Sequence, residues 1–403
     1  MATAVLQLDI GNIPARLDGL ERYGHALILV RRGPVPLAIV TLPVYGGSVE
    51  RQPLLDAIAE RAAERLMSIE AREALGVRPP GAPDAAHATV AVCTRDRPED
   101  LDRCLAALRS LDSTGQELLV IDSASAGDAT VEIVRRHPGV RYVREERPGL
   151  DIARNRALRE ARGDIVAFCD DDAVPDANWL NALLANFAHP RTLCVTGLTL
   201  PLELESEAQE WFERTNEFSR GLDRRRFDGT KDDPFLVSRI GAGVNMALRR
   251  SVLDLIGPFD EALDAGTATR SGGDHDMFAR ILLSGYSIVY EPAAISHHRH
   301  RRDWASLRDA VRGYGTGVYA FLTKHVVAGE PRPIFVALSW GVSQTRELLR
   351  ALFRLPHATP TDLVIDELRG CLAGPLAYRK ARRRLREESR RAITSAALGS
   401  TSG

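Results

Sequence analysis

Three consecutive aspartates, Asp170 to Asp172, follow the apolar run at residues 165–168. Side chains alternate along an extended chain, so Asp170 and Asp172 are expected to converge on one face while Asp171 points away. Two carboxylates on one face suit a hard divalent cation with oxygen ligands, Mn²⁺ or Mg²⁺. The alternative is a solvated acidic turn that caps the helix expected over residues 179–187. Adjacent like charges beside a buried strand are costly unless a cation or a donor offsets them, which favours the cation site.

The elements that position this cluster follow a regular pattern from residue 88 onward. Apolar strands and amphipathic helices alternate, with strands expected at 89–93, 117–122, 140–144 and 164–170 and helices at 98–111, 129–136 and 150–161. Such alternation predicts a doubly wound α/β fold with a parallel sheet and helices on both faces. Ligands bind such sheets beyond the carboxyl ends of the strands. Polar residues stand at those ends: Thr94, Arg95, Asp122 and the three aspartates.

The rest of the chain divides into two further regions. Short apolar runs at 5–10, 26–30 and 37–42, a hairpin connection at 31–36 and a charged helix at 54–75 predict a small β-rich accessory domain over residues 1–85. A Pro- and Gly-rich linker at 79–83 lies near the C-terminal end of this region. The α/β domain is expected over 86–325, and residues 326–403 form a helical C-terminal region, with helices at 334–353 and 378–391.

Composition restricts the classes of partner. The 403 residues carry a formal net charge of −1, so no overall field recruits nucleic acid. The five cysteines are not spaced as metal ligands and are expected to be buried thiols of a reducing compartment. The sequence shows no secretion signal and no apolar run long enough to span a membrane, so we expect a cytoplasmic protein.

The C-terminal region nevertheless allows a peripheral contact with the inner face of the membrane. Residues 378–391 contain eight basic and two acidic side chains. A basic helix of this kind is attracted to anionic lipid. A solvated helix packed on the catalytic domain through Leu385 is the alternative.

Four motifs occur in a fixed order along the α/β region: Ala-Val-Cys-Thr-Arg-Asp-Arg-Pro at 91–98, Val-Ile-Asp-Ser-Ala-Ser at 120–125, Pro-Gly-Leu-Asp-Ile-Ala-Arg-Asn-Arg-Ala-Leu at 148–158, and Phe-Cys-Asp-Asp-Asp-Ala-Val-Pro at 168–175. Together they resemble the family-two inverting glycosyltransferases, which have a fold of the GT-A type. The resemblance covers about residues 88–320 and adds a fifth motif, Gly-Gly-Asp-His-Asp-Met-Phe-Ala-Arg at 272–280.

The resemblance implies a role for several side chains on the donor side. Asp170 and Asp172 would be the two ends of the DxD metal motif, and Asp170 and Asp171 would also lie on the donor side. The remaining nucleotide and donor contacts implied by the motifs are Thr94, Arg97 and Asp122 at the base and ribose, Arg154 and Asn155 near the nucleotide or diphosphate, and Asn245 near the donor sugar or acceptor.

The fifth motif implies the catalytic base. Asp274 aligns with the carboxylate that deprotonates the acceptor hydroxyl as it attacks the anomeric carbon. Gly273 stands where the family usually has a glutamate, which puts acceptor recognition in doubt. An N-cap is the alternative role for Asp274, and Asp276 is expected to pair with Arg280 within the helix.

A histidine-rich segment, Ser-His-His-Arg-His-Arg-Arg at 296–302, follows the strand expected at 286–295. By resemblance one histidine would complete the metal shell, and His298 fits best, with His297 and His300 as competitors. Imidazole is a reasonable ligand for manganese. A basic loop that binds phosphate by charge is the alternative.

The sequence therefore predicts metal-assisted, inverting transfer of a sugar from a nucleoside-diphosphate sugar to an acceptor hydroxyl. A UDP-sugar is the favoured donor, and a lipid-linked acceptor is one of the candidates. Residues 213–233 and the segment around Tyr314 are candidate loops that close over the donor. The rivals are a sugar nucleotidyltransferase, which normally has a glycine-rich phosphate loop that 93–98 lacks, and an inactive nucleotide-sugar-binding module.

Overall fold

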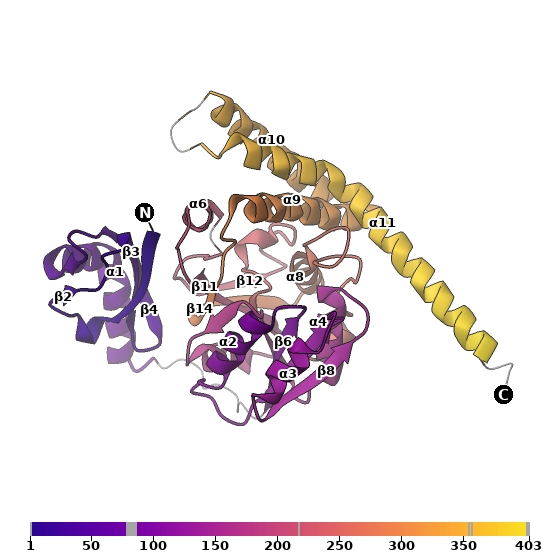
Figure 1. The fold of residues 1–403 in the computed structure, drawn as a ribbon, viewed down its shortest axis with the longest axis horizontal. Helices are drawn as coiled ribbons and strands as arrows, with labels where there is room; N and C mark the ends of the chain where they lie inside the picture. Colours follow the sequence, from indigo (N-terminus) through magenta and orange to yellow (C-terminus); the bar gives the residue numbers. More distant parts are fainter. Residues whose placement is uncertain (1, 78–86, 217, 354, 356–357, 400–403) are drawn as a thin grey trace.

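The computed structural model describes residues 2–77, 87–216, 218–353, 355 and 358–399. A central sheet with helices on both faces carries a small N-terminal domain on one side and a layer of long C-terminal helices on another (Figure 1). The predicted linker at 79–83 lies outside the described residues. The α/β fold class expected from the alternating pattern is confirmed.

The central sheet has nine strands in the order β10-β14-β11-β13-β9-β6-β7-β8, with β12 paired to β14. Its strands are β6 (Ala88–Thr94), β7 (Glu117–Ser123), β8 (Val140–Glu145), β9 (Ile165–Cys169), β10 (Ala173–Pro175), β11 (Thr192–Pro201), β12 (Arg225–Asp228), β13 (Asn245–Arg249) and β14 (Ser287–His298). The strands β6, β7, β8 and β9 run parallel to their neighbours within this group, and β11 is parallel to β14.

Both faces of the sheet are covered, which explains why its strands are continuous apolar runs. Alternate residues of β6 enter different cores: Val90 and Val92 pack with helices on one face, and Ala91 packs with helices on the other. The first face holds α2 (Pro98–Leu108), α3 (Ala129–Arg135) and α5 (Trp179–Leu184). The second holds α4 (Leu150–Glu160), α8 (Gly273–Leu283) and α9 (Trp304–Val327).

The alternation of strands and helices predicted a parallel sheet, but the sheet is mixed. β13 lies between β9 and β11 and is antiparallel to both. It comes from the segment that contains Asn245, which was expected near the donor sugar or acceptor. The segment 241–244 remains outside the strand, and Asn245 is the first strand residue.

The N-terminal residues form the expected β-rich unit. Its sheet has the order β1-β3-β4, with strands β1 (Ala2–Asp9), β3 (Tyr23–Arg32) and β4 (Val35–Pro43), and α1 (Arg51–Ala74) packs against β4. The hairpin between β3 and β4 is confirmed, since Arg32 pairs with Val35 across a two-residue turn at Gly33. Short strands β2 (Arg16–Leu17) and β5 (Val49–Glu50) pair with each other.

This N-terminal unit contacts the strands that carry the histidine segment. Leu29 of β3 packs in one buried cluster with Leu198 and Leu200 of β11 and Ile295 of β14. Arg31 Nη1 lies 2.8 Å from Asp176 Oδ2. The contacts therefore support β11 and β14 from outside the catalytic sheet.

Three long helices form the C-terminal layer: α9, α10 (Arg332–Leu352) and α11 (Thr361–Gly399) (Figure 1). α11 approaches α9 closely because glycines face the contact: a Cβ on Gly315 would lie 2.5 Å from the Glu367 carbonyl oxygen. The segment around Tyr314 was expected to be a loop, but it is the middle of α9. Residues 213–233 include the end of α6 (Glu207–Asn216) and all of β12. Among the helices described, none is long and apolar enough to cross a membrane.

Candidate active site

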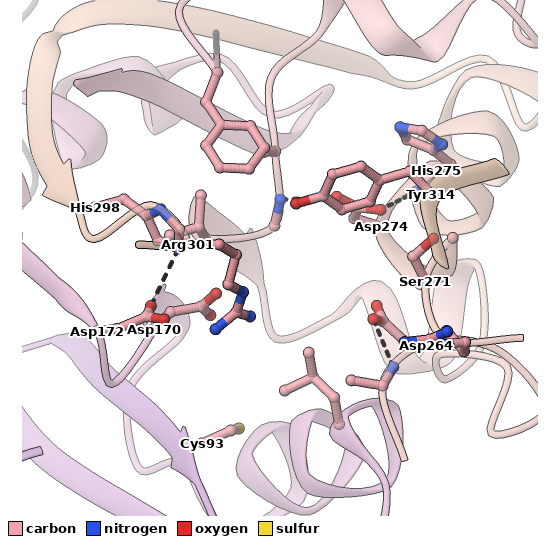
Figure 2. A pocket seen from close by; sticks show the side chains of 18 of the residues that line it. Cys93, Asp170, Asp172, Asp264, Ser271, Asp274, His275, His298, Arg301 and Tyr314 are labelled. Atoms are coloured by element: carbon pink, nitrogen blue, oxygen red, sulfur yellow. Dashed lines mark hydrogen bonds and ion pairs between the residues drawn. The ribbon is translucent and has the colours of Figure 1, made fainter. Parts of the chain in front are cut away.

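A cavity of about 530 Å³ lies at the carboxyl ends of β6 and β9, beneath α9. That volume is typical of small-molecule sites. Figure 2 shows Asp170, Asp172 and His298 on one side of the cavity and Asp264 and Asp274 on the other. Of the residues predicted for the site, the cavity is lined by Thr94, Arg97, Arg154, Asp170, Asp171, Asp172, Asp274 and His298.

The aspartate turn is held in place by two residues after β6. The Thr94 hydroxyl donates to Asp171 Oδ2 at 2.7 Å, and Arg97 Nη1 donates to Asp171 Oδ1 at 2.8 Å and to Asp172 Oδ2 at 2.7 Å. Burial and the neighbouring Asp172 raise the pKa of Asp171 to about 7, against the opposing effect of Arg97. Thr94 and Arg97 thus bind the turn itself, while still facing the cavity.

His298 is the histidine that joins the aspartates. Its Nε2 lies 3.2 Å from Asp172 Oδ1. Burial favours the neutral imidazole, but Asp172 and Asp170 outweigh it and raise the pKa of His298. In the same pair burial opposes ionisation of Asp172, while His298 and Arg97 lower the pKa of that carboxyl.

The two competing histidines have other partners. His297, which points to the opposite side of the strand, has its Nε2 2.9 Å from Gln7 Nε2 in the N-terminal unit and does not line the cavity. His300 lines the cavity, but its Nε2 lies 3.0 Å from Glu213 Oε2. Strand alternation therefore separates His298 from His297.

A carboxylate and an imidazole are both suitable ligands for a manganese ion, and those of Asp172 and His298 lie close together. Within the described ranges, however, no three His, Cys, Asp or Glu side chains are arranged as a ready metal site. Asp172 and His298 supply two converging donors, and Asp170 lines the same wall. The remaining coordination positions would have to come from a ligand.

Asp274 is the first acidic residue of α8 and faces the cavity. Its Oδ2 accepts a hydrogen bond from the Gly243 amide at 2.8 Å, and its Oδ1 accepts one from the His275 amide at 2.8 Å. Burial opposes ionisation, but His275, Arg154 and the two amides outweigh it and lower the pKa of Asp274. The carboxylate is thus ionised at neutral pH.

Arg154 lies between two buried carboxyl groups. Its Nη1 is 2.8 Å from Asp264 Oδ2 and 3.1 Å from Asp151 Oδ1. Asp264 faces the cavity and adopts a left-handed backbone conformation, φ 71°. Such strain in a residue other than glycine is typical of functional sites. Asp264 was not predicted from the sequence, since its partner Arg154 is 110 residues away and no periodic pattern surrounds it.

Gly273 has no room for a side chain. A Cβ there would lie 1.9 Å from Asp151 Oδ2, an atom that is buried and has no hydrogen-bond partner within the described part of the chain. Burial, Asp264 and Asp274 raise the pKa of Asp151, against Arg154. The carboxyl of Asp151 on α4 therefore fills the volume beside α8 that a side chain at position 273 would occupy.

Three predicted donor contacts lie behind the cavity wall rather than on it. Asp122 accepts from the Tyr142 hydroxyl at 2.7 Å. Asn155 exchanges hydrogen bonds with the Phe259 backbone at 2.8 and 3.0 Å. Asn245 accepts from Trp179 Nε1 at 2.8 Å and donates to the carbonyls of Ala294 and Leu198. All three side chains are fully buried and do not line the cavity.

Arg301 was not singled out from the sequence, and Tyr314 was expected only as part of a loop that closes over the donor. Arg301, exposed on the wall near Asp170, belongs to the histidine-rich segment, and within the described residues it forms no ion pair. Tyr314 projects from α9 toward the Asp274 side (Figure 2). The run of basic residues at 299–302 was the available signal for Arg301.

Comparison with known proteins agrees with this architecture. The family model described as glycosyl transferase family 2 matches residues 89–257. A pre-mycofactocin glycosyltransferase from Mycobacterium tuberculosis is 29% identical over 236 residues, which cover 56% of this chain and 46% of the relative. The succinoglycan biosynthesis protein ExoM of Rhizobium meliloti is 26% identical over 230 residues, 55% of this chain and 69% of the relative. The chain thus spans about half the length of the mycobacterial relative.

Among solved structures, the mannosyltransferase PcManGT of Pyrobaculum calidifontis, in complex with GDP-Man and Mn²⁺, shares the fold. The TM-score is 0.51 at 20% sequence identity, covering 78% of this chain and 96% of that one. The family match covers the strands that end at the aspartate turn, and the fold match covers most of the chain. Residues 89–257 of this chain thus form a glycosyltransferase family 2 domain, and the surrounding fold is of the GT-A type.

Proposed function

We propose that this protein transfers a sugar, with inversion, from a nucleoside-diphosphate sugar to an acceptor hydroxyl. The observation that carries the proposal is the placement of an ionised carboxylate, Asp274, across one cavity from the Asp172–His298 pair (Figure 2). Inversion needs a base on the face opposite the leaving group, and the two sets of residues occupy opposite walls.

On the leaving-group side, Asp170, Asp172 and His298 would hold a divalent cation. When bound, Mn²⁺ or Mg²⁺ would neutralise charge on the departing diphosphate. PcManGT holds Mn²⁺ with its nucleotide sugar, which supports this assignment. Arg301 on the same wall is placed to attract the phosphate groups by charge. UDP-sugars remain the favoured donors, and GDP-sugars are the first alternative because PcManGT was solved with GDP-Man.

On the acceptor side, Asp274 takes the proton of the attacking hydroxyl. The amides of Gly243 and His275 orient its carboxylate and leave lone pairs on both oxygens for the acceptor. Arg154, fixed between Asp151 and Asp264, adds positive charge near the reacting centre without facing solvent. A positioned general base contributes roughly 10²–10⁴-fold to the rate.

A donor panel tests this function against its two rivals. UDP-, GDP- and dTDP-sugars are incubated with the protein and Mn²⁺, and release of the nucleoside diphosphate is measured with and without chelator. We expect metal-dependent release from one nucleotide class. Pyrophosphate formation from a sugar 1-phosphate and a nucleoside triphosphate would identify a nucleotidyltransferase instead. Donor binding with no product under any condition would identify an inactive binding module.

We further propose that the C-terminal helices hold the protein at an anionic membrane surface on the cytoplasmic side. The apolar face of α10 points outward: Phe335, Leu338, Val342 and Phe353, spaced along one side of the helix, are 63–75% exposed. Trp340 and Gln344, on its inner side, neighbour Glu367 of α11. An amphipathic helix of a soluble protein would instead bury its apolar side and expose its polar side.

Charge decides between lipid and a second copy of the chain as the occupant of this face. Two exposed leucines of α11, Leu372 and Leu376, are followed on the same side of the helix by Arg379 and Arg383. Anionic lipid complements the basic half of α11, whereas a second copy would bring the same basic helix with it. A surface that combines an apolar stripe with basic residues is typical of interfacial helices.

Flotation with vesicles of phosphatidylglycerol and phosphatidylcholine tests the surface. We expect the protein to float at low salt, and we expect Phe335→Asp/Val342→Asp to remain at the bottom. Met67→Asp/Leu75→Asp, which adds the same charge on exposed positions of the N-terminal unit, should float like the wild type. A wild-type protein that stays soluble at low salt, or that elutes as a dimer lost in the α10 variant, would overturn the membrane assignment.

A further inference from the structure

One face of α9 lines the cavity over about three turns. Leu307, Val311, Tyr314 and Val318 are spaced by four, three and four residues, which places them on one side of the helix. All four border the cavity that contains Asp172 and Asp274. The helix thus presents an apolar wall to a site whose opposite wall is charged.

Aromatic rings connect this wall to the candidate metal ligand. The ring of Phe218 meets His298 edge to face, with centroids 5.3 Å apart, and Phe212 meets Phe218 at 5.3 Å. Phe212 in turn lies 6.5 Å from Tyr314. These rings form a continuous aromatic surface from the edge of the aspartate turn to α9.

Tyr314 is the accessible member of this surface. Its side chain remains 37% exposed although the residue borders the cavity, whereas Phe212 is 4% exposed. Val311 and Val318, one turn before and after it, are buried, with only 5% and 8% of their surface exposed. A partly exposed aromatic ring on an otherwise buried apolar wall offers a flat contact for a ligand.

The far end of the wall is closed by the C-terminal layer. Trp340 of α10 and Glu367 of α11 border the same cavity, and Val318 of α9 packs in the core that Trp340 also contacts. The C-terminal helices are therefore part of the site and not only a surface attachment.

The two ends of the cavity differ in chemistry. The end at β6 and β9 is lined by Asp170, Asp172 and Arg301, which suits a diphosphate with its cation. Asp274 lies across the cavity from Asp170 and Asp172, on the side where Tyr314 of α9 is drawn (Figure 2). With the donor in the charged end, the apolar wall is available to a molecule that brings a hydroxyl to Asp274.

We propose that the acceptor of this enzyme carries an apolar group, aromatic or alkyl, attached near the reactive hydroxyl, and that the wall from Phe218 to Val318 binds it. This inference rests on the proposed function, because it assigns the charged end to the donor. It adds the class of acceptor, which neither the family nor the site carboxylates specify. Tyr314 stacks on the apolar group, and Val311 and Val318 border it on either side.

Matched acceptors test the inference directly. Methyl, phenyl and octyl glycosides of glucose, galactose and mannose are compared at saturating donor, and release of nucleoside diphosphate above the acceptor-free background is recorded. We expect KM for the phenyl or octyl member of a pair to be on the order of 10–100-fold lower than for the methyl member, since burial of one apolar group supplies that factor. Equal values, or a preference for free oligosaccharides, would overturn the proposal.

Variants of the wall provide the second arm. Tyr314→Ala, Val311→Thr and Val318→Thr should bring the ratio of the methyl to the phenyl KM toward one, because each removes apolar contact with little change in volume at the valines. Val327→Thr is the matched control, since Val327 lies on the same helix but is 68% exposed and outside the cavity. A ratio that changes equally in the control would also overturn the proposal.

Failure of the proposed function gives a different result. Donor turnover without acceptor, and its dependence on metal, report the charged end alone. If no donor is turned over, binding of phenyl and methyl glycosides is measured by saturation-transfer NMR. A preference for the phenyl compound that Tyr314→Ala removes would retain the apolar subsite while the transferase function is rejected. No preference in binding would reject the subsite.

Discussion

The indole nitrogen of Trp179 donates a 2.8 Å hydrogen bond to Oδ1 of Asn245, and this bond joins α5 to the central strand β13. Asn245 Nδ2 donates to the carbonyl oxygens of Ala294 and Leu198, in β14 and β11. The side chain of Asn245 thus forms hydrogen bonds with three neighbouring elements. Gly197 allows this, because a Cβ there would come within 2.6 Å of Asn245 Nδ2.

Asn245→Ala should therefore affect stability more than catalysis. We expect the free energy of unfolding to fall by about 2–4 kcal/mol, since each buried polar group left unsatisfied costs about 1–3 kcal/mol. Urea denaturation measures this, and Asn12→Ala, at an exposed position, is the control. Weakened donor binding at unchanged stability would return Asn245 to the donor contacts predicted from the sequence.

Asp274→Asn should retain donor affinity and lose turnover. The substitution removes the proton acceptor but keeps the size of the side chain, so we expect kcat to fall by about 10²–10⁴-fold or more. Calorimetric titration of the donor and initial rates separate the two quantities. Asp254→Asn, on an exposed face of α7 (Val252–Leu255), should behave as the wild type. A collapse of donor affinity with kcat preserved would assign Asp274 to sugar binding.

The neighbouring histidines offer a matched pair for the metal site. His298→Ala should weaken binding of Mn²⁺ by about 10-fold or more, whereas His297→Ala should leave it unchanged, because His297 contacts Gln7 on the other side of the strand. The electron paramagnetic resonance signal of free Mn²⁺ reports the affinity without requiring turnover. Equal affinity of both variants would remove His298 from the proposed metal ligands.

Asp276 provides a test of stability against pH. This fully buried carboxylate accepts from Arg280 Nε at 2.8 Å, Lys324 Nζ at 2.8 Å and His325 Nε2 at 3.0 Å, which confirms the ion pair expected with Arg280. Burial opposes ionisation, but His325, Arg280 and Lys324 outweigh it and lower the pKa of Asp276. Asp276→Asn should cost about 3–5 kcal/mol at pH 7, because positive charges remain buried without their partner.

The sign of the pH dependence follows from the lowered pKa. A carboxyl whose pKa falls on folding adds its full stability above the unfolded pKa, near 4, and loses it as the pH falls toward the folded value. The difference in Tm between wild type and Asp276→Asn should therefore be largest at pH 7 and shrink below pH 4. A difference that stays constant from pH 7 to pH 3 would contradict this assignment.

The features that the sequence could predict are those with a local pattern. The runs that became β6, β7 and β9 are apolar throughout because the sheet is covered on both faces, and their ends place Thr94 and Asp170 at one edge. β13 was not predicted, since five residues beginning with asparagine show no clear period. Asp264 was missed because its role depends on Arg154, far away in the chain.

The orientation of helix faces and of individual side chains could not be predicted from the sequence either. The spacing of α10 predicts an amphipathic helix, but spacing does not say whether the apolar side faces the core or solvent. Tyr314 was expected in a loop, and the regular helix α9 instead holds it in the cavity. Asp122, Asn155 and Asn245 match the family motifs, yet hydrogen bonds from distant elements turn their side chains inward.

The contact between Gly273 and Asp151 restricts how this protein can change by mutation. With 1.9 Å between a Cβ at position 273 and Asp151 Oδ2, every single replacement of the glycine forces the buried carboxyl group of Asp151 to shift. Shortening Asp151 alone opens a void and leaves Arg154 with one acidic partner fewer. A library that varies either position alone should return the native residue, whereas joint variation of 151 and 273 opens acceptor-side sequences that stepwise substitution cannot reach.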